Sequence, residues 1–413
     1  MKKGLIFADD LTGALDTGVE LASSGYNTVV QSNGDTDMSV IDDDSIQVVV
    51  INTASRHLQP KAAYRIIYTL CEKAKQLGFT QIYKKTDSAL RGNVGAELSA
   101  LLDCMKAPIL FVPAFPDMGR VLRKGALFIE GVPVDQSDFG KDPFTPVRFS
   151  HIDEILHASA ESLSLCLHES DHVLSKPSAN VHAINASTRE ELTLIATNAK
   201  QSGITLFAGC AGFAGHLPFI WELSASEIQI PVLPRRMLIF SGSLNRITVQ
   251  QLHRGREMGY YTHTVQRDEL DDPETFPYDD VLYALDKGHV AIVESFSSLK
   301  PSMQPALEHA EVRDRMDAAR SLGMIASKLI KAAKDCMPLI IGGDTLLSVM
   351  LELQCRRLYP LKLIATGTVL AIADTCLGHI PIATKSGGLG PLHVIERALD
   401  YLHANKGGTR NAH

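Results

Sequence analysis

The sequence predicts an α/β protein of two domains, each a mostly parallel sheet flanked by helices, with the ligand site in the cleft between them. Its 413 residues exceed what one core usually holds, at roughly 100–200 residues per domain. Short apolar segments alternate with segments of helical length and periodicity, which is the pattern of parallel β-α-β units. Loops rich in Gly, Asp and Ser follow the apolar segments, where open parallel sheets bind their ligands.

In the first half, each expected strand runs into a loop and then a helix. The strands are expected at 5–8, 47–51, 81–84, 109–113, 181–184 and 205–208, and the helices at 11–24, 60–76, 94–105 and 188–201. Residues 114–180 interrupt this rhythm, because prolines are spaced through a polar sequence there. We expect loops and short strands in that region.

A second α/β unit begins after a short proline-containing segment. Pro231 and Pro234 make residues 228–236 the best candidate for a linker, so the predicted domains are 1–230 and 236–405. The second unit has expected strands at 237–240, 290–294, 339–341, 363–365 and 380–384, and expected helices from Asn245 and over 316–333.

Composition and charge narrow the class of protein. The chain is 45% apolar and 21% charged with a net charge of −7, and no block of Lys or Arg stands out, so we expect no nucleic-acid partner. No apolar segment of about 20 residues is present, and the run at 4–8 ends at two aspartates, so neither a membrane span nor a signal peptide is expected. The seven cysteines include no Cys-x-x-Cys pair and no metal-ligand spacing, which favours reduced thiols and a cytoplasmic location.

The first candidate motif is Ala-Asp-Asp-Leu-Thr-Gly-Ala at 8–14, between an expected strand and an expected helix. Asp9, Asp10 and Thr12 lie in this loop. Adjacent carboxylates can accept hydrogen bonds from the hydroxyls of a polyol or hold a cation. The alternative is that one aspartate only caps the helix.

The second motif, at 83–93, places charged and hydroxyl side chains after another expected strand. Its members are Lys84, Lys85, Thr86, Asp87, Ser88 and Arg91. Arg56 follows the strand at 47–51 and is expected at the same edge of the sheet. Because Arg binds a carboxylate through two hydrogen bonds and Lys supplies a mobile charge, this group predicts a site for a small anion.

Three glycine-containing turns follow strands in the second unit. Their residues are Ser241, Gly242 and Ser243; Gly342, Gly343, Asp344 and Thr345; and Lys385, Gly387 and Gly388. Backbone amides and helix N-termini in such turns can bind phosphates. No G-x-x-x-x-G-K-[ST], G-x-G-x-x-G or G-x-S-x-G motif occurs, which disfavours a P-loop kinase, a dinucleotide dehydrogenase and a hydrolase.

These motifs together resemble the four-carbon acid sugar kinase family. The resemblance rests on the segments at 8–18, 84–97, 113–120, 131–134, 342–345 and 384–390, and extends from about residue 5 to about residue 400. It implies an N-terminal domain that binds the sugar acid and a C-terminal domain that binds the nucleotide. It also implies phosphorylation of the terminal hydroxyl of threonate, erythronate or a 3-oxo relative, with ATP and Mg²⁺.

Two local features refine the resemblance. Asp-Ser-Ala-Leu-Arg-Gly-Asn at 87–93 is similar to the D-threonate kinase branch, whereas the 3-oxo-tetronate branch resembles Phe-Asp-Ser-Thr-Pro-Lys-Gly-Asn. The sequence departs from the family at 365–368, where Ala-Thr-Gly-Thr stands in place of the usual Pro-Gly pair. This departure concerns the contacts to adenine or ribose.

We therefore predict a kinase that phosphorylates the 4-hydroxyl of D-threonate. Arg56, Lys84, Lys85 and Arg91 are expected to bind the carboxylate, while Asp9, Asp10 and Asp87 read hydroxyls. Asp344 is the first candidate for the general base or a Mg²⁺ ligand, with Asp87 and Asp10 as competitors.

Other readings remain open. The acid could be D-erythronate, L-threonate or a 3-oxo-tetronate, and the chain could be a binding regulator without catalysis. A homodimer is the default expectation for the assembly.

Overall fold

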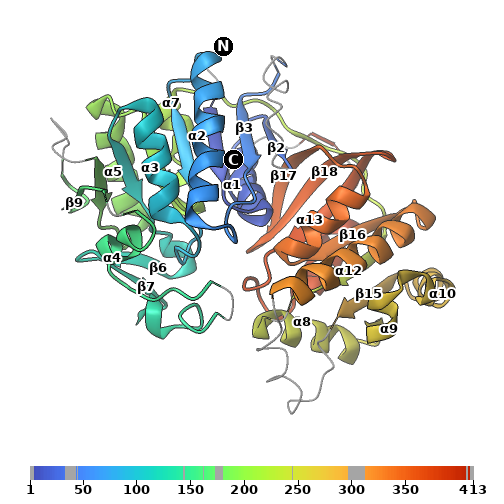
Figure 1. Cartoon of the computed structure of the whole chain (residues 1–413). Coiled ribbons are helices and arrows are strands. Elements are labelled where there is room, and N and C mark those ends of the chain that lie inside the picture. Colours follow the sequence, from blue (N-terminus) through green and yellow to red (C-terminus); the bar gives the residue numbers. More distant parts are fainter. Residues whose placement is uncertain are drawn as a thin grey trace. The chain divides into compact units, whose positions relative to one another are not determined.

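The computed structural model describes residues 4–32, 43, 45–142, 145–160, 162–172, 180–243, 245–295, 312–405 and 408–409. These residues form two compact units, one of Met1–Val29 with Gly34–Ser226 and one of Val30–Asn33 with Glu227–His413. Both units are α/β, with a mostly parallel sheet and flanking helices (Figure 1), which confirms the predicted fold class. The predicted domain boundaries and the predicted cleft site stay predictions.

The sheet of the first unit has the order β3-β1-β4-β11-β5-β10-β9, and all of its neighbouring strands are parallel. Its strands are β1 (Gly4–Ala8), β3 (Val48–Asn52), β4 (Ile82–Lys85), β5 (Ile109–Val112), β9 (Leu165–His168), β10 (Val181–Ile184) and β11 (Leu206–Gly209). Every residue of these strands except those of the edge strand β9 is buried. Continuous burial is typical of a parallel sheet covered on both faces.

The helices of the first unit connect these strands. They are α1 (Leu11–Ser23), α2 (Pro60–Gln76), α3 (Val94–Met105), α4 (Ile152–His157), α5 (Arg189–Ser202), α6 (Ala211–Ala214) and α7 (Leu217–Trp221). Local sequence accounts for their starts: Asp10 caps α1, Pro60 occupies the first turn of α2, and Thr188 with Glu191 forms a capping box on α5.

The region that interrupts the sequence rhythm carries a small antiparallel sheet. It consists of β6 (Arg120–Arg123), β7 (Ala126–Ile129) and β8 (Val132–Pro133). Leu122 forms an antiparallel bridge with Ala186, so this small sheet is attached to the segment that follows β10.

The sheet of the second unit has the order β14-β15-β13-β16-β19-β18-β17. Its strands are β13 (Arg236–Ser241), β14 (Tyr261–Val265), β15 (Val290–Ser295), β16 (Cys336–Ile341), β17 (Arg357–Ala365), β18 (Thr368–Thr375) and β19 (Gly378–Lys385). The pairs from β14 to β19 are parallel, whereas β18 pairs with both β19 and β17 antiparallel. The strand expected at 363–365 is only the end of β17, and β18 was not expected at all.

The helices of the second unit are α8 (Arg246–Glu257), α9 (Arg267–Asp271), α10 (Tyr278–Gly288), α12 (Val312–Ala332), α13 (Gly343–Glu352) and α14 (Val394–Ala404). Two short strands, β12 (Gln229–Ile230) and β20 (Gly408–Thr409), pair antiparallel. Ile230 and Leu233, inside the predicted linker, pack into the core of this unit. Part of β2 (Thr28–Gln31) also belongs here, because Val30 and Gln31 pair with β17.

A search of the described helices for one both long enough and apolar enough to cross a membrane finds none.

Candidate functional site

The first site lies where three neighbouring strands of the first unit end at the same level. Ala8, the last residue of β1, pairs with Asn52 at the end of β3 and with Lys85 at the end of β4. The loops after these strands therefore emerge side by side, as predicted for open parallel sheets. They carry the carboxylates, arginines and lysines of the two N-terminal motifs.

Arg56 is the centre of this cluster. Its Nε donates to Asp9 Oδ2 at 2.7 Å, and its two terminal nitrogens donate to the carboxylate of Asp10 at 2.8 and 2.7 Å. A third carboxylate, that of Asp87, lies 3.5 Å from Arg56 Nη2. Arg56 thus holds three loops together through the chain's own carboxylates.

Asp10 caps a helix and also belongs to this cluster. Its Oδ1 accepts a hydrogen bond from Gly13 N at 2.9 Å and so caps α1, and its Oδ2 accepts one from Thr12 Oγ1 at 2.6 Å. The same carboxylate forms the two hydrogen bonds with Arg56. The cap therefore positions Asp10 within the cluster.

Arg91 is the second arginine of the site. Its Nε and Nη2 each donate to the carboxylate of Asp87 at 2.9 Å, and its Nη1 donates to Asp142 at 3.1 Å. The ring of Phe139 lies 5.1 Å from the guanidinium carbon, a cation–π distance. Burial alone would raise the pKa of Asp87, but Arg91 and Arg56 hold it well below its ordinary value. Asp87 is therefore an ionised hydrogen-bond acceptor.

Lys84 is fully buried and forms an ion pair beneath the loops. Its Nζ lies 2.9 Å from Glu97 Oε2 on α3, and the other oxygen of Glu97 accepts from Ser55. Burial raises the pKa of Glu97, Lys84 opposes that shift, and the nearby Asp9 carboxylate adds to it. This arrangement ties β4 to α3 and to the loop that carries Arg56. Lys84 is thus a structural part of the site.

Lys85 also acts electrostatically on a carboxyl of α1. Lys85 Nζ donates to the backbone oxygen of Thr86 at 2.7 Å, and its charge acts on the carboxyl of Asp16 in α1. Burial raises the pKa of Asp16 to about 7, with Lys85 opposing the shift and Asp10 adding to it. Asp16 therefore changes its charge near neutral pH.

Two buried polar atoms of the cluster have no hydrogen-bond partner among the described residues. They are Asp9 Oδ1 and Thr86 Oγ1. A buried acceptor or hydroxyl without a partner costs free energy, about 1–3 kcal/mol each, which a ligand hydroxyl would recover. Ser88 lies half-buried in the same loop. The cluster can thus bind a small ligand that carries both hydroxyls and negative charge.

The second site lies where three neighbouring strands of the second unit end at the same level. Ser241 of β13 pairs with Ile341 of β16, and Ile341 pairs with Lys385 of β19. The three glycine-containing turns therefore leave the sheet next to one another. Gly342 N donates to Lys385 O at 3.0 Å and connects two of these turns.

Glycines let these turns approach one another closely. A Cβ on Gly387 would lie 2.4 Å from Ser243 Oγ, and one on Gly242 would lie 2.4 Å from Thr345 Oγ1. Gly342 has a φ of +106°, which L side chains rarely adopt. Asn245 Oδ1 caps α8 just after the first turn, and Gly343 opens α13 after the second. The cradle is made of backbone amides and helix starts.

Lys385 and Asp344 are the charged residues predicted for this cradle. Lys385 is fully buried, and its Nζ donates to Ser386 O at 2.9 Å and lies 3.5 Å from Thr248 Oγ1. Asp344 is exposed in the first turn of α13, where it contacts no ion-pair partner among the described residues. It is free to bind a cation or to accept a proton.

The segment at 365–368, where the sequence departs from the family's Pro-Gly pair, still contains a glycine, Gly367. Gly367 has a φ of +68° in the turn between β17 and β18, and its backbone oxygen accepts from Ser386 N at 3.0 Å. A Cβ there would lie 2.5 Å from Leu389. This turn therefore packs directly on the third glycine-containing loop.

Sequence reasoning missed several residues that complete the sites. Glu97 and Asn93 lie inside the motif at 84–97, and Asn93 Nδ2 donates to Ser55 O and Leu58 O at 3.0 and 2.8 Å. Asp16 lies inside the motif at 8–18. These three residues could have been proposed from the sequence because they lie inside the two motifs. Glu294, fully buried beside Arg256 at the end of β15, had no signal in the sequence.

Family models match both units of the chain. The model described as a sugar-binding N-terminal domain matches residues 4–217, and the one described as a nucleotide-binding C-terminal domain matches residues 238–395.

Named relatives and solved structures also match. A D-erythronate kinase of Heliobacterium modesticaldum is 34% identical over 66% of this chain and 65% of that protein. A D-threonate kinase of Salmonella typhimurium is 28% identical over 97% and 98%, and a 3-oxo-tetronate kinase of Burkholderia multivorans is 26% identical over 95% of each. A crystal structure of a Salmonella typhimurium protein described as a tRNA synthase has a TM-score of 0.77 at 21% identity, over 96% of this chain and 99% of that one. At that identity it shows the fold alone.

Proposed function

The chain belongs to the four-carbon acid sugar kinase family, and from that premise we propose that it transfers the γ-phosphate of ATP to the 4-hydroxyl of D-threonate. Membership of the family supports ATP-dependent phosphorylation of a four-carbon sugar acid. The choice of D-threonate is the finer proposal. Two full-length matches to D-threonate kinases and the Leu-Arg-Gly-Asn form of the motif at 90–93 support it.

The cluster around Arg56 carries the proposal for the acid. A four-carbon sugar acid presents one carboxylate and three hydroxyls, which need cations and acceptors respectively. Arg56, Arg91 and Lys85 supply the cations, and Asp9 supplies a buried acceptor oxygen with no other described partner. Asp10, Asp87, Thr12, Thr86 and Ser88 complete the polar lining, while Lys84 acts from beneath through Glu97.

The cradle around Gly342 and Gly387 carries the proposal for ATP. Gly242 and Gly387 leave no room for a Cβ, so their turns lie close together, and backbone amides in such turns can bind phosphates. Mg²⁺ prefers oxygen ligands, and the exposed carboxylate of Asp344 at the start of α13 fits that preference. When bound, the cation would neutralise phosphate charge. Transfer requires that the acid and the nucleotide meet in the working enzyme.

Asp344 is the proposed base or cation ligand. Asp10 and Asp87 are both bound by arginines, and the lowered pKa of Asp87 makes it a weak base. For Asp344→Asn we expect kcat to fall by about 10²–10⁴-fold at saturating Mg²⁺, the range for loss of a general acid or base. Steady-state ADP release measures this. Near-normal turnover would remove Asp344 from the chemistry.

A substrate panel tests the proposed acid directly. ADP release is measured with D-threonate, D-erythronate, L-threonate and a 3-oxo-tetronate at equal concentration, and kcat/KM is compared. We expect D-threonate to have the highest value. A higher value for another acid would overturn the substrate assignment and leave the family activity intact. Stabilisation by an acid without any turnover would instead support a regulator.

A further inference from the structure

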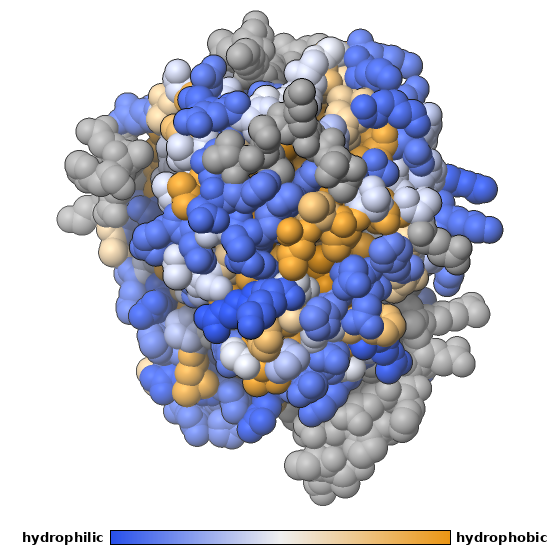
Figure 2. All heavy atoms as spheres, turned by 90° about the vertical axis from the view of Figure 1, so that its left-hand side faces the viewer, coloured by the Kyte–Doolittle hydropathy of each residue, from blue (hydrophilic) through white to orange (hydrophobic). Residues whose placement is uncertain are grey.

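The edge of the first unit's sheet brings together three residues that bind soft metals. They are Cys166 and His168 on β9 and His182 on β10, and one ligand atom from each lies within 4.8 Å of the others. Figure 2 shows the side of the molecule that lies to the left in Figure 1, where β9 is labelled; it is largely hydrophilic, with several apolar areas of which the broadest is near the centre of the view.

Strand pairing creates this cluster. In the parallel pair of β9 and β10, Cys166 lies directly opposite His182, and His168 lies two residues further along β9. Because alternate residues of a strand point to the same face, the side chains of Cys166 and His168 share a face. The sequence analysis found no metal-ligand spacing because the pairing joins residues that are 16 apart in the chain.

The two imidazole nitrogens of the cluster already lie close together. His168 Nε2 and His182 Nδ1 are 2.9 Å apart and share a hydrogen bond. In a tetrahedral zinc site, with Zn–N bonds of about 2.0–2.1 Å, two ligating nitrogens lie about 3.3 Å apart. For both nitrogens to bind one ion, they would separate by a few tenths of an ångström and both rings would turn their lone pairs toward it. The proton of the shared hydrogen bond would move to the other nitrogen of its own ring.

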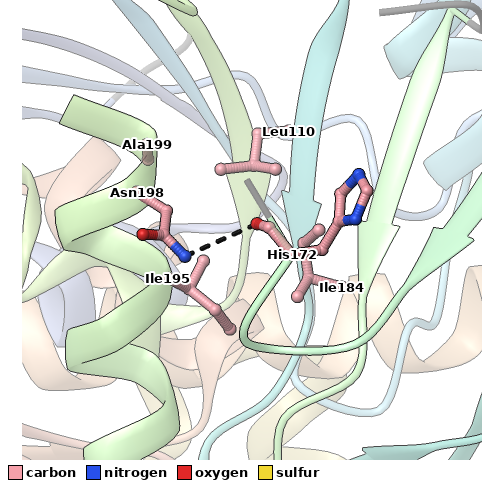
Figure 3. A pocket seen from close by; sticks show the side chains of 6 residues that line it. All are labelled: Leu110, His172, Ile184, Ile195, Asn198 and Ala199. Atoms are coloured by element: carbon pink, nitrogen blue, oxygen red, sulfur yellow. Dashed lines mark hydrogen bonds between the residues drawn. The ribbon is translucent and has the colours of Figure 1, made fainter. Parts of the chain in front are cut away.

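His172 supports the cluster from outside. Its ring stacks on His168 with centroids 4.2 Å apart, and Asn198 on α5 donates to its backbone oxygen at 3.5 Å. Figure 3 shows His172 at the side of a small cavity of about 10 Å³, with its ring turned away from Asn198. The stacking orients His168, so His172 is a positioning residue.

We propose that Cys166, His168 and His182 bind one Zn²⁺ ion at the edge of the sheet. A thiolate with two imidazoles selects Zn²⁺ over Mg²⁺, which prefers oxygen ligands. Binding releases the thiol proton of Cys166 to solvent. The ion joins β9 to β10, so its effect is on the stability of this edge. The site is separate from the phosphate chemistry.

Cobalt substitution in the full-length protein tests the site. Titration with Co²⁺ is expected to produce a thiolate-to-cobalt charge-transfer absorption that saturates at one equivalent. Cys166→Ser should abolish this absorption, and His168→Asn should weaken Co²⁺ binding by at least tenfold. Cys376→Ser is the matched control, since Cys376 is an exposed free thiol in the second unit. It should leave the absorption unchanged.

Thermal unfolding gives a second readout that does not depend on catalysis. A saturating excess of Zn²⁺ should raise the Tm of the wild type by about 2–4 °C or more, since ligands that bind only the folded state stabilise it. Cys166→Ser should show no rise and should keep its ADP release with D-threonate. No thiolate band in the wild type, a band that persists in Cys166→Ser, or an equal Tm rise in both proteins would overturn the proposal.

Discussion

The two strand-end sites occupy equivalent places in their sheets but are built from opposite chemistry. In the first unit, charged side chains hold the loops: Arg56 alone contacts Asp9, Asp10 and Asp87. In the second unit, glycines and helix starts form the turns, and at Gly242 and Gly387 their close approach leaves no room for a Cβ. Side-chain charges arranged in a network can distinguish hydroxyls and a carboxylate by position. Backbone amides suit phosphates, which present the same oxygens in every nucleotide.

Because the two sites are built differently, substitutions in them should affect protein stability and ligand binding to different degrees. The charged site depends on ion pairs that are buried in the folded chain, so damage there should affect folding as well as substrate affinity. The glycine site carries little of the unit's apolar core, so damage there should affect mainly nucleotide affinity.

The largest expected effect is on folding, from Lys84→Met. This change leaves the buried carboxyl of Glu97 without its partner and should lower the free energy of unfolding by about 3–5 kcal/mol, measured by urea denaturation. Lys106→Met is the matched control, because Lys106 pairs with Asp103 on the surface and should cost less than about 1 kcal/mol. Equal losses in the two variants would mean that the buried pair is not what holds β4 to α3.

Next in size is the loss of acid affinity in Arg56→Ala. Without this guanidinium, three carboxylates face an anionic substrate, and the KM for the acid should rise on the order of 100-fold while that for ATP changes little. Arg65→Ala, an exposed arginine on α2, serves as the control. An equal rise in both KM values would remove Arg56 from acid binding, and Arg56→Lys tests the charge alone if the alanine variant unfolds.

A smaller effect, on the KM for ATP and not on that for the acid, is expected from Gly387→Ala in the second unit. The added methyl would lie 2.4 Å from Ser243 Oγ and 3.3 Å from its Cβ, so Ser243 in the neighbouring turn must shift. The KM for ATP should therefore rise about tenfold with that for the acid unchanged. In Gly388→Ala the nearest atom, Asn245 Nδ2, lies at 3.3 Å, and the effect should be weaker. If both variants raise the KM for the acid instead, the assignment of the acid to the first site and ATP to the second is wrong.

The smallest effect concerns pH and Asp16. Its folded pKa of about 7 lies above the ordinary value of 3.8, so the folded protein holds the proton more tightly and stability falls as pH rises through about 4 to 7. Asp16→Asn should flatten this fall and be more stable than the wild type by about 1–2 kcal/mol at pH 8. Denaturation at pH 4, 6 and 8 measures it, with exposed Asp400→Asn as the control. A parallel pH profile in Asp16→Asn would contradict the raised pKa.

Local sequence determined most of the sheet framework and the place of both sites. Continuous apolar runs such as 48–51 and 109–112 predict buried strands, and parallel strands bring their carboxyl ends to one edge. The motifs at those ends are therefore recognisable from residue types and spacing alone. Most of β17 and all of β18 were not predicted, since the stability of such antiparallel strands depends on which neighbours cover them.

The tertiary structure decided how the charges pair. The sequence predicts Arg56 and Lys84 as ligands for the acid, and that role stays a prediction. The folded chain adds that Arg56 pairs with Asp9 and Asp10 and that Lys84 is buried against Glu97. The cluster of Cys166, His168 and His182 arises in the same way, from strand register alone. Residue types and spacing predict which groups reach a common edge, but the choice of partner depends on distances of a few ångströms between segments far apart in the chain. Those distances exist only once the strands have paired.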